Sequence, residues 1–390
     1  MHNWAWSNCI SRKLIYLSVA AVFLSGAVGL DGLQPRAAAQ QWLTDANDRI
    51  EEHRKANLTV NVVDNAGRAV PGADVHVQMK RHAFGFGMAV PASLIVGTST
   101  NATTFRQKLL ENFNHAVLEN DLKYPHWLGL AGAGPPWNQK KHAPGWLNAN
   151  GLPTRGHYLS WATWSNHNAW GESQDVNTLP QRVFDHIGDK LPKVGQSVFE
   201  WDVINHPVGW LNDTYENRVE AAGLYAEGLD FYADIIRHAR TVINTPVAQG
   251  GLGGVEMPLW INEDNIIAGN GRANEYERVI DYLIDNDASP DGIGFQAHFI
   301  EDFNGRVSGS SPQQVYERME RFAQKGSRLK ATEFDIDVGT NESWQAQAMH
   351  DYLTVMFSHP AMDAITMWSF WQGSGWRPNA ALYRTNWSEK

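Results

Sequence analysis

The sequence predicts an α/β fold, a (β/α)8 TIM barrel, and two observations lead to it. Short apolar runs rich in β-branched residues recur eight times between residues 83 and 390, and amphipathic helical stretches fall between most of them. Strands that alternate with helices are typical of a parallel sheet, and eight such units close into a barrel. A chain of 390 residues suits a barrel with a leader and loop insertions.

A doubly wound open sheet is the alternative architecture. It is usually accompanied by a Gly-rich turn that follows a strand and opens a helix. Gly85-Phe86-Gly87 lacks the third glycine of that motif, and the glycines at 250–254 lie in a predicted loop. The sequence therefore favours the closed barrel.

The first 39 residues are predicted to be a signal peptide. Arg12 and Lys13 precede an apolar run at residues 14–30, and Ala37-Ala38-Ala39 offers a small-residue cleavage site. We expect a secreted or periplasmic protein without stable membrane insertion after cleavage. The apolar run is long, so an uncleaved membrane anchor stays open as the alternative.

Residues 40–82 are predicted to form a helix and a β-hairpin in front of the barrel. Apolar residues have near-helical spacing over residues 42–55, and residues 58–63 and 73–79 alternate like strands around a turn at 64–67. A lone hairpin is marginally stable in water, so we expect it to pack against the barrel.

The barrel domain is predicted to span residues 83–390. We expect its strands at residues 83–89, 116–119, 154–161, 198–205, 259–262, 292–298, 329–335 and 364–370. The clearest helices are expected at 216–241, 274–285, 312–325 and 344–357. Lys390 follows the last strand closely, so we expect the closing C-terminal helix of the barrel to be missing from this sequence.

Composition narrows the choice of partner. The formal net charge of −10 argues against nucleic acid and against anionic membranes. The chain has 17 tryptophans, and indole rings serve equally as sugar-stacking platforms and as core residues. We expect a monomer, and the sole cysteine, Cys9, precedes the apolar run of the leader, so the mature chain has no disulfide.

Polar and aromatic side chains cluster at the predicted carboxyl ends of six of the eight strands. Barrel enzymes place their sites at that end. One such residue alone is more often structural, but the repeated pattern favours a site. The cluster contains Glu119, Asn120, Lys123, His157, Trp161, Asn205, His206, Gln296, His298, Glu333, Trp368 and Trp376.

A metal site and a serine nucleophile are weaker interpretations of this cluster. His157, His206 and His298 could hold a metal together with Glu333, but no pair of ligands has the spacing of one helical face, and histidines on separate strands equally suit sugar binding. Gly373-Ser374-Gly375 does not match a nucleophile elbow. We therefore expect no metal.

An ordered series of motifs runs through residues 83–387. The first motif, Glu-Asn-x-x-Lys, is matched by Glu119, Asn120 and Lys123, and the second, Arg-Gly-His-x-x-x-Trp, by His157 and Trp161. The third, Trp-Asp-Val-x-Asn, is matched by residues 201–205. Two further strands are matched by residues 292–298 and 332–335, and the last strand by Trp368 and Trp376. Together these segments resemble glycoside hydrolase family 10, the endo-β-1,4-xylanases.

This resemblance implies a retaining endo-glycosidase that acts on β-1,4-linked xylan or a related plant polysaccharide without a cofactor. Glu333 would be the nucleophile that forms a covalent glycosyl-enzyme. His298 and Asn205 would hydrogen-bond the nucleophile and the sugar 2-hydroxyl, and Gln296 would orient the surroundings of Glu333. The other residues would hold glycone sugars or wall the site: Glu119, Asn120, Lys123, His157, Trp161, Trp368 and Trp376.

His206 stands where the family carries its acid/base glutamate. Retaining hydrolysis needs one group that protonates the leaving oxygen and later deprotonates water. An imidazolium can perform the first step, and the second only if its pKa falls once Glu333 is esterified. Among nearby carboxylates, Glu200 is roughly 20 Å back along the strand at ~3.3 Å per residue, whereas Glu263 and Asp213 stay open as proton donors.

Two classes of function therefore remain. The first is an active retaining glycosidase, for which the presence of Glu333 and the glycone-side residues argues. The second is a catalytically impaired barrel that binds polysaccharide, for which His206 argues. Reducing-sugar release from xylan distinguishes the two.

Overall fold

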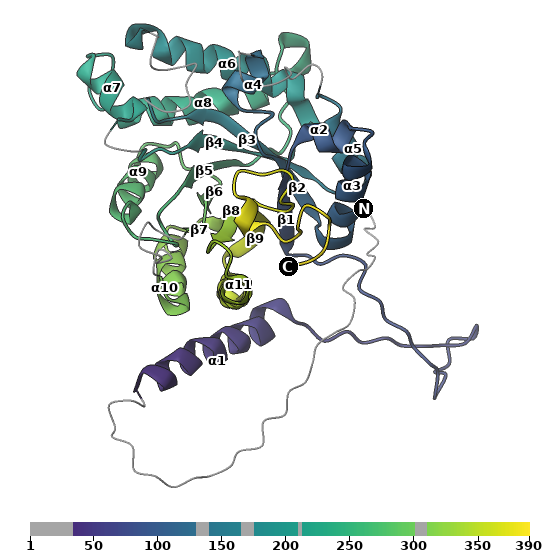
Figure 1. Ribbon diagram of the computed structural model, residues 1–390. Helices are drawn as coiled ribbons and strands as arrows, with labels where there is room; N and C mark the ends of the chain where they lie inside the picture. Colours follow the sequence, from purple (N-terminus) through teal and green to yellow (C-terminus); the bar gives the residue numbers. More distant parts are fainter. Residues whose placement is uncertain (1–33, 130–139, 165–174, 210–212, 301–309) are drawn as a thin grey trace.

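Eight parallel strands close into a barrel in the computed structural model, which describes residues 34–129, 140–164, 175–209, 213–300 and 310–390 (Figure 1). Neighbouring strands pair in chain order, and β1 pairs with β9 to close the ring. This confirms the predicted (β/α)8 barrel. The barrel strands are β1 (Gly85–Val90), β2 (His115–Leu118), β3 (Thr154–Trp161), β4 (Glu200–Asn205), β5 (Leu259–Glu263), β6 (Gly292–Phe295), β8 (Arg328–Asp337) and β9 (Met362–Met367).

The sixth barrel strand is broken at its carboxyl end. It resumes as β7 (His298–Ile300), which pairs with the end of β8. Between the two pieces, Ala297 has a φ of 62°, in the left-handed region that non-glycine residues seldom adopt. The break places Gln296 and His298, two predicted site residues, at the barrel mouth.

Helices surround the barrel, as alternation of strands and helices predicts (Figure 1). Their apolar faces pack inward; on the eighth helix these include Phe231, Ile235, Ile236 and Ile243. The α-helices of the barrel are α2 (Ala92–Val96), α3 (Thr100–Asn112), α4 (Tyr124–Leu128), α5 (Ala143–Ala149), α6 (Leu179–Val194), α7 (Tyr215–Ala221), α8 (Leu229–Asn244), α9 (Ala273–Asp285), α10 (Pro312–Ala323) and α11 (Glu342–Ser358). Short 3-10 helices are η3 (Val176–Thr178), η4 (Gly195–Ser197), η5 (Val247–Gln249) and η6 (Pro378–Ala380).

Local sequence signals explain where several helices begin and end. Ser311 and Thr214 start α10 and α7 with capping boxes, in which side chain and backbone satisfy each other's hydrogen bonds. The single helix predicted at 216–241 is instead α7 and α8. Gly223, with a φ of 69°, lies in the connection between them, and a left-handed residue cannot continue an α-helix.

Two glycines make room for large aromatic side chains in the barrel wall. A Cβ at Gly156 would lie 2.3 Å from the ring of Trp201, and one at Gly292 would lie 2.2 Å from the ring of Trp260. Both indoles are fully buried. Side chains at these two positions would displace the indoles, so the glycines fix the packing beneath the mouth.

The predicted hairpin is the main departure from the sequence analysis. Residues 58–80 contain one antiparallel bridge, between Val63 and Ala69, and no strand. The expectation that this segment packs on the barrel is wrong, because Leu58, Val77 and Met79 are more than 60% exposed. Alternating apolar residues favour an extended chain, but no sheet face is available to bury them. Figure 1 shows the segment extending away from the barrel.

The predicted helix of the extension is α1 (Gln34–Arg54), which lies beside α11 (Figure 1). Arg54 donates to the carbonyls of Phe357, His359 and Met362 at 2.5–2.8 Å, at and just after the last turn of α11, and Trp42 and Ala46 join the core. After β9, the described chain up to Lys390 contains the 3-10 helix η6 and no α-helix.

Most of the predicted signal peptide, residues 1–39, lies outside the described residues. None of the helices that the structure describes combines the length and the apolar character needed to cross a membrane.

Candidate active site

Glu333 lies on β8 near the barrel mouth and is buried among hydrogen-bond donors and positive charges. Its Oε1 accepts a hydrogen bond from Nδ2 of Asn262 at 2.8 Å and lies 4.0 Å from Nε2 of His157. Its Oε2 lies 3.5 Å from Nε2 of His298. The two carboxylate oxygens therefore have different partners, which fix the plane of the group.

The charges around Glu333 keep it ionised. Burial alone would raise the pKa of the carboxyl, but His157, His298 and Lys123 outweigh burial and lower it to about 2. The carboxylate is therefore a stable anion at any physiological pH. An anion held in a buried, polar pocket is suited to attack an electrophilic carbon.

His298, on β7, is held by a second carboxylate. Its Nδ1 lies 2.9 Å from Oδ1 of Asp335, and Oδ2 of Asp335 accepts from Nε1 of Trp376 at 2.9 Å. Burial lowers the pKa of His298, yet Asp335 and Glu333 raise it to about 9. His298 is thus a cation near neutral pH, and it lies close to Glu333, as the sequence analysis expected.

His157 on β3 is positioned in a similar way by β4. Its Nδ1 lies 2.8 Å from Oδ2 of Asp202, and Arg155 holds the other oxygen of Asp202 at 2.6 Å. The ring of His157 is buried and lies within 4.0 Å of the carboxylates of Asp202 and Glu333. It therefore contributes to the electrostatics around Glu333.

Asn262, at the end of β5, connects three strands. Thr332 donates to Oδ1 of Asn262 at 2.6 Å, and Nδ2 of Asn262 donates to Glu333 and, at 2.9 Å, to Oδ1 of Asn205. Asn262 therefore stands between Asn205 and Glu333. Sequence analysis missed Asn262 as a site residue. The available signal was a polar residue directly after the apolar run Leu259-Trp260-Ile261.

The acidic and basic residues that follow β2 face the same carboxylate. Burial raises the pKa of Glu119, and the negative charge of Glu333 raises it further. Burial lowers the pKa of Lys123, and the negative charge of Glu333 opposes this change. Asn120 hydrogen-bonds Glu119. Lys123 Nζ lies 6.0 Å from the ring centroid of Trp368, which packs edge-on against His157. Glu119 and Lys123 therefore lie within electrostatic reach of Glu333.

The tryptophans differ in exposure. Trp368 and Trp161 are buried, whereas Trp376 is 45% exposed with its ring 4.7 Å from that of His298. Trp376 is therefore the one of these three that offers a wide surface to a bound molecule. Trp161 instead packs on the ring of His206, with centroids 4.5 Å apart.

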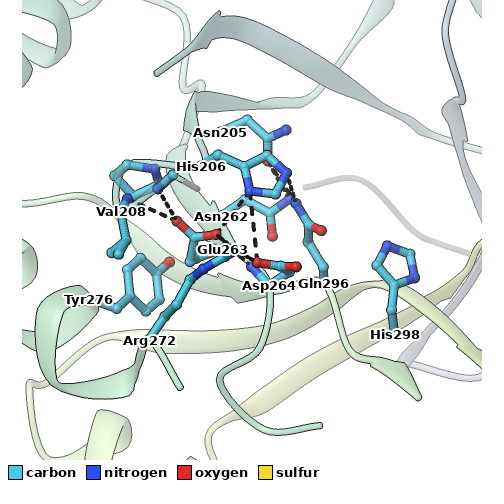
Figure 2. Close-up of polar contacts among 12 residues, drawn as sticks. Asn205, His206, Val208, Asn262, Glu263, Asp264, Arg272, Tyr276, Gln296 and His298 are labelled. Atoms are coloured by element: carbon cyan, nitrogen blue, oxygen red, sulfur yellow. Dashed lines mark hydrogen bonds and ion pairs between the residues drawn. The ribbon is translucent and has the colours of Figure 1, made fainter. Parts of the chain in front are cut away.

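His206 follows β4 and is buried between Trp161, Glu263 and Gln296 (Figure 2). Its Nδ1 lies 2.9 Å from Oε1 of Glu263, and its Nε2 lies 2.9 Å from Nε2 of Gln296. The backbone at His206 has a φ of 56°, a strained conformation before a proline. Gln296 also contacts Asn205 at 3.3 Å, so a chain of hydrogen bonds joins His206 to Glu333.

The three carboxylates considered as alternative acids differ in their positions. Glu200 is buried at the start of β4, paired with Arg155 and Lys330. Asp213 pairs with Arg218 at 2.7 Å. Glu263 lies beside His206 with a fully buried side chain, and it is saturated with donors. None of the three replaces His206 at the end of β4.

Among the described residues, one group of side chains places three possible metal ligands within reach of one another: His206, Glu263 and Asp264. Arg272 lies against both carboxylates, 3.2 Å from Oε1 of Glu263 and in direct contact with Asp264 (Figure 2). Its guanidinium supplies the positive charge that the two acids require. The histidine set considered from the sequence, His157, His206 and His298, does not form such a group.

Comparisons with known proteins agree with this architecture. The model of glycosyl hydrolase family 10 matches residues 76–390. The anti-sigma-I factor RsgI6 of Acetivibrio thermocellus is 24% identical over 89% of this chain and 41% of its own length. Endo-1,4-beta-xylanase 1 of Arabidopsis thaliana is 24% identical over 94% of this chain and 36% of its own length. The chain thus spans less than half the length of these curated relatives.

Solved structures share the fold. Xylanase 10B from Thermotoga petrophila RKU-1, in complex with xylobiose, superposes with a TM-score of 0.64 at 20% identity, over 79% of this chain and 91% of that one. Native xylanase 10B from Thermotoga maritima gives a TM-score of 0.63 at 21% identity, over 79% and 92%.

Proposed function

Because this chain belongs to glycosyl hydrolase family 10, we propose that it hydrolyses β-1,4-linked xylan, or a related plant polysaccharide, with retention of configuration. Glu333 would attack the anomeric carbon, so that a bond from the carboxylate to that carbon forms as the glycosidic bond breaks. The leaving oxygen takes a proton. Water then attacks the glycosyl-enzyme, gives up a proton and releases Glu333.

The observation that carries this proposal is the state of Glu333. Its carboxyl is buried, yet its pKa is lowered to about 2 by surrounding cations. Holding an anion away from water is costly unless it is paired and hydrogen-bonded, and Asn262, His298 and Lys123 supply these partners. A nucleophile must be ionised and poorly hydrated, so the arrangement fits covalent catalysis.

A second observation supports a sugar ligand beside Glu333. Nδ2 of Asn205 is buried and has no hydrogen-bond partner among the described residues. An unsatisfied buried donor costs about 1–3 kcal/mol, so a partner is expected when the site is occupied. Asn205 is linked to Glu333 through Asn262, which places the free N–H near the reacting sugar. We assign its partner as the 2-hydroxyl of that sugar.

The exposed indole of Trp376 suits the face of a neighbouring sugar ring. It is held in place by its hydrogen bond to Asp335 and by its contact with His298. Aromatic rings bury large areas with little loss of conformational freedom. We further propose that the mature protein is secreted or periplasmic and monomeric. N-terminal sequencing of the mature protein and light scattering test these two points.

His206 favours a second candidate function, a polysaccharide-binding barrel with impaired catalysis. The histidine stands at the position of the expected acid/base, is 2% exposed, and has partners for both ring nitrogens. In that case the migration of the purified protein would be slowed by xylan in affinity electrophoresis, but the protein would release no reducing sugar.

The deciding experiment is reducing-sugar release from xylan by the purified protein, with Glu333→Gln measured in parallel. Activity in the wild type and none in the variant supports the proposed hydrolase. Equal release by both proteins would contradict the role given to Glu333. No release by either, with xylan still bound, would favour the binding function.

A further inference from the structure

We propose that Glu263 is a positioning residue for His206, and that the pair forms the acid/base unit of this site. This assignment rests on the proposed function, because it concerns the proton transfers of that reaction. The sequence analysis considered Glu263 only as a proton donor in place of His206. The geometry points to a different relation, in which Glu263 acts through the imidazole.

The carboxylate of Glu263 is surrounded by donors. Oε2 accepts from the backbone N–H groups of Val208 at 2.9 Å and Gly209 at 3.3 Å, and Oε1 accepts from the N–H of Asp264 at 2.9 Å. Arg272 and His206 also donate to Oε1 (Figure 2). An ionised carboxylate is acceptor-only, so these contacts match the charged form. The side chain is fully buried, and its two oxygens are taken up by these contacts.

The direction of the hydrogen bonds fixes the tautomer of His206. Because Glu263 accepts, Nδ1 of His206 carries a proton. On the other side, Thr332 donates to Oδ1 of Asn262, which turns Nδ2 of Asn262 toward the oxygen of Asn205.

Oδ1 of Asn205 also accepts a hydrogen bond from Nε2 of Gln296. The same amide nitrogen of Gln296 is in hydrogen-bond contact with Nε2 of His206. When the ring of His206 is neutral, its proton is on Nδ1 and Nε2 bears the lone pair, so Nε2 is the nitrogen that exchanges protons.

Glu263 also compensates the charge that His206 gains. When the glycosyl-enzyme is hydrolysed, Nε2 takes a proton from the attacking water, and an imidazolium forms beside the Glu263 carboxylate. In the glycosylation step of the following turnover, the imidazolium gives that proton to the leaving oxygen. Two carboxylates face the ring: Glu263, and Asp264, whose Oδ1 lies 3.9 Å from Nδ1 of His206. Arg272 forms ion pairs with both carboxylates. Trp161 covers the ring face. Glu263 is the carboxylate in direct hydrogen bond with the ring.

The test is a double-mutant cycle of Glu263→Gln and His206→Ala, assayed on xylan and on an aryl β-xyloside with a good leaving group. An amide at 263 can donate to Nδ1 and so favours the wrong tautomer; the same change in a Ser-His-Asp triad costs about 10⁴-fold in kcat. We expect Glu263→Gln to lower kcat on xylan by roughly 10²- to 10⁴-fold with KM little changed. In the His206→Ala background, Glu263→Gln should cause no further loss.

Equal losses in both backgrounds would overturn the assignment, since they would indicate a role independent of His206. Glu320→Gln is a matched control, because Glu320 also lies beside a histidine, 3.3 Å from His359, outside the site. It should leave both activities unchanged. Glu263→Asp, which keeps the charge, should recover part of the activity.

A measurement on the wild-type protein keeps the assignment testable even if the Glu263 variants do not fold. Nitrogen-15 NMR of the histidine rings, with His206 identified by its absence in His206→Ala, reports the tautomer directly. Protonation at Nδ1 is expected, and protonation at Nε2 alone would overturn the assignment. Because this readout needs no turnover, an inactive wild type would contradict the proposed function without deciding the role of Glu263.

Discussion

Asn262 donates a hydrogen bond from Nδ2 to Oε1 of Glu333 over 2.8 Å, and the same nitrogen contacts Oδ1 of Asn205 at 2.9 Å. One buried amide thus joins β4, β5 and β8 at the barrel mouth. It orients the Glu333 carboxylate on one side and the Asn205 amide on the other. Its replacement should therefore change the chemistry of Glu333 more than the stability of the barrel.

Asn262→Asp should raise the pKa of Glu333. The change replaces a donor by a carboxylate, and two carboxylates in contact cannot both ionise easily. In the wild type, Glu333 is ionised above a pKa of about 2, so it sets no acid limb in the usual assay range. In the variant, kcat/KM on an aryl xyloside should fall on the acid side, between about pH 4 and 7. An unchanged pH profile would contradict the contact as described.

Glu333→Gln should abolish hydrolysis and leave the fold intact. The amide has nearly the same shape but cannot attack the anomeric carbon, and loss of a covalent nucleophile costs on the order of 10⁴- to 10⁶-fold in kcat. The variant leaves the buried cations His298 and Lys123 without their counter-charge, so its thermal unfolding temperature should fall while the unfolding transition stays cooperative. Glu277→Gln, on the outer face of α9, is the control, because Glu277 pairs only with Arg321 and Lys325 among the described residues.

The positions of the site residues could be predicted from the sequence because each stands at the end of an apolar run. Such runs end at one rim of the barrel, so Glu333, His298 and Lys123 were expected together. Their pairing could not be predicted. Whether Asn205 or Asn262 contacts Glu333 depends on the register between β4 and β5, and a pattern along one strand contains no register.

The same limit explains the error at residues 58–80. Alternation of Leu58, Val60 and Val77 with polar residues predicts strands, but the segment contains one antiparallel bridge and no strand. The pattern does not say which surface covers the apolar side chains. The Glu263–His206 pair could not be predicted for a related reason. The two residues are 57 positions apart, and nothing in the sequence around either residue indicates that they are in contact.

Asp335→Asn should shift the alkaline limit of activity to lower pH. Asp335 is the main partner that raises the pKa of His298 to about 9, so His298 should lose its proton at a lower pH in the variant. The loss of that cation also weakens the stabilisation of ionised Glu333. A pH series of kcat/KM measures the shift, and an alkaline limb that does not move would show that His298 does not control it.

The same variant makes a prediction for stability. The folded pKa of His298 lies above its ordinary value of 6.5, so its contribution is fully present below about pH 6.5 and is lost as pH rises through about 9. The free energy of unfolding should therefore differ most between wild type and Asp335→Asn below pH 6.5. The difference should shrink toward pH 9. Urea unfolding at pH 6 and pH 9.5 measures both values.

His206→Ala should separate the two chemical steps. An aryl xyloside with a good leaving group needs no acid, so glycosylation of Glu333 should remain fast, whereas hydrolysis of the intermediate loses its base. We expect a burst of aryl release, then a steady state slower by roughly 10²- to 10⁴-fold, and a similar loss on xylan. Azide attacks the glycosyl-enzyme without a base, so it should restore turnover and yield the β-xylosyl azide.

His206→Glu completes this comparison, because it restores the residue type expected at the end of β4. Next to the charged Glu263, a new carboxyl would share a buried site with a like charge, which raises its pKa and favours the protonated form. If the histidine is the working acid/base of this site, the glutamate variant should be less active on xylan than the wild type. A gain on xylan, with little change on the aryl xyloside, would instead identify His206 as the cause of impaired catalysis.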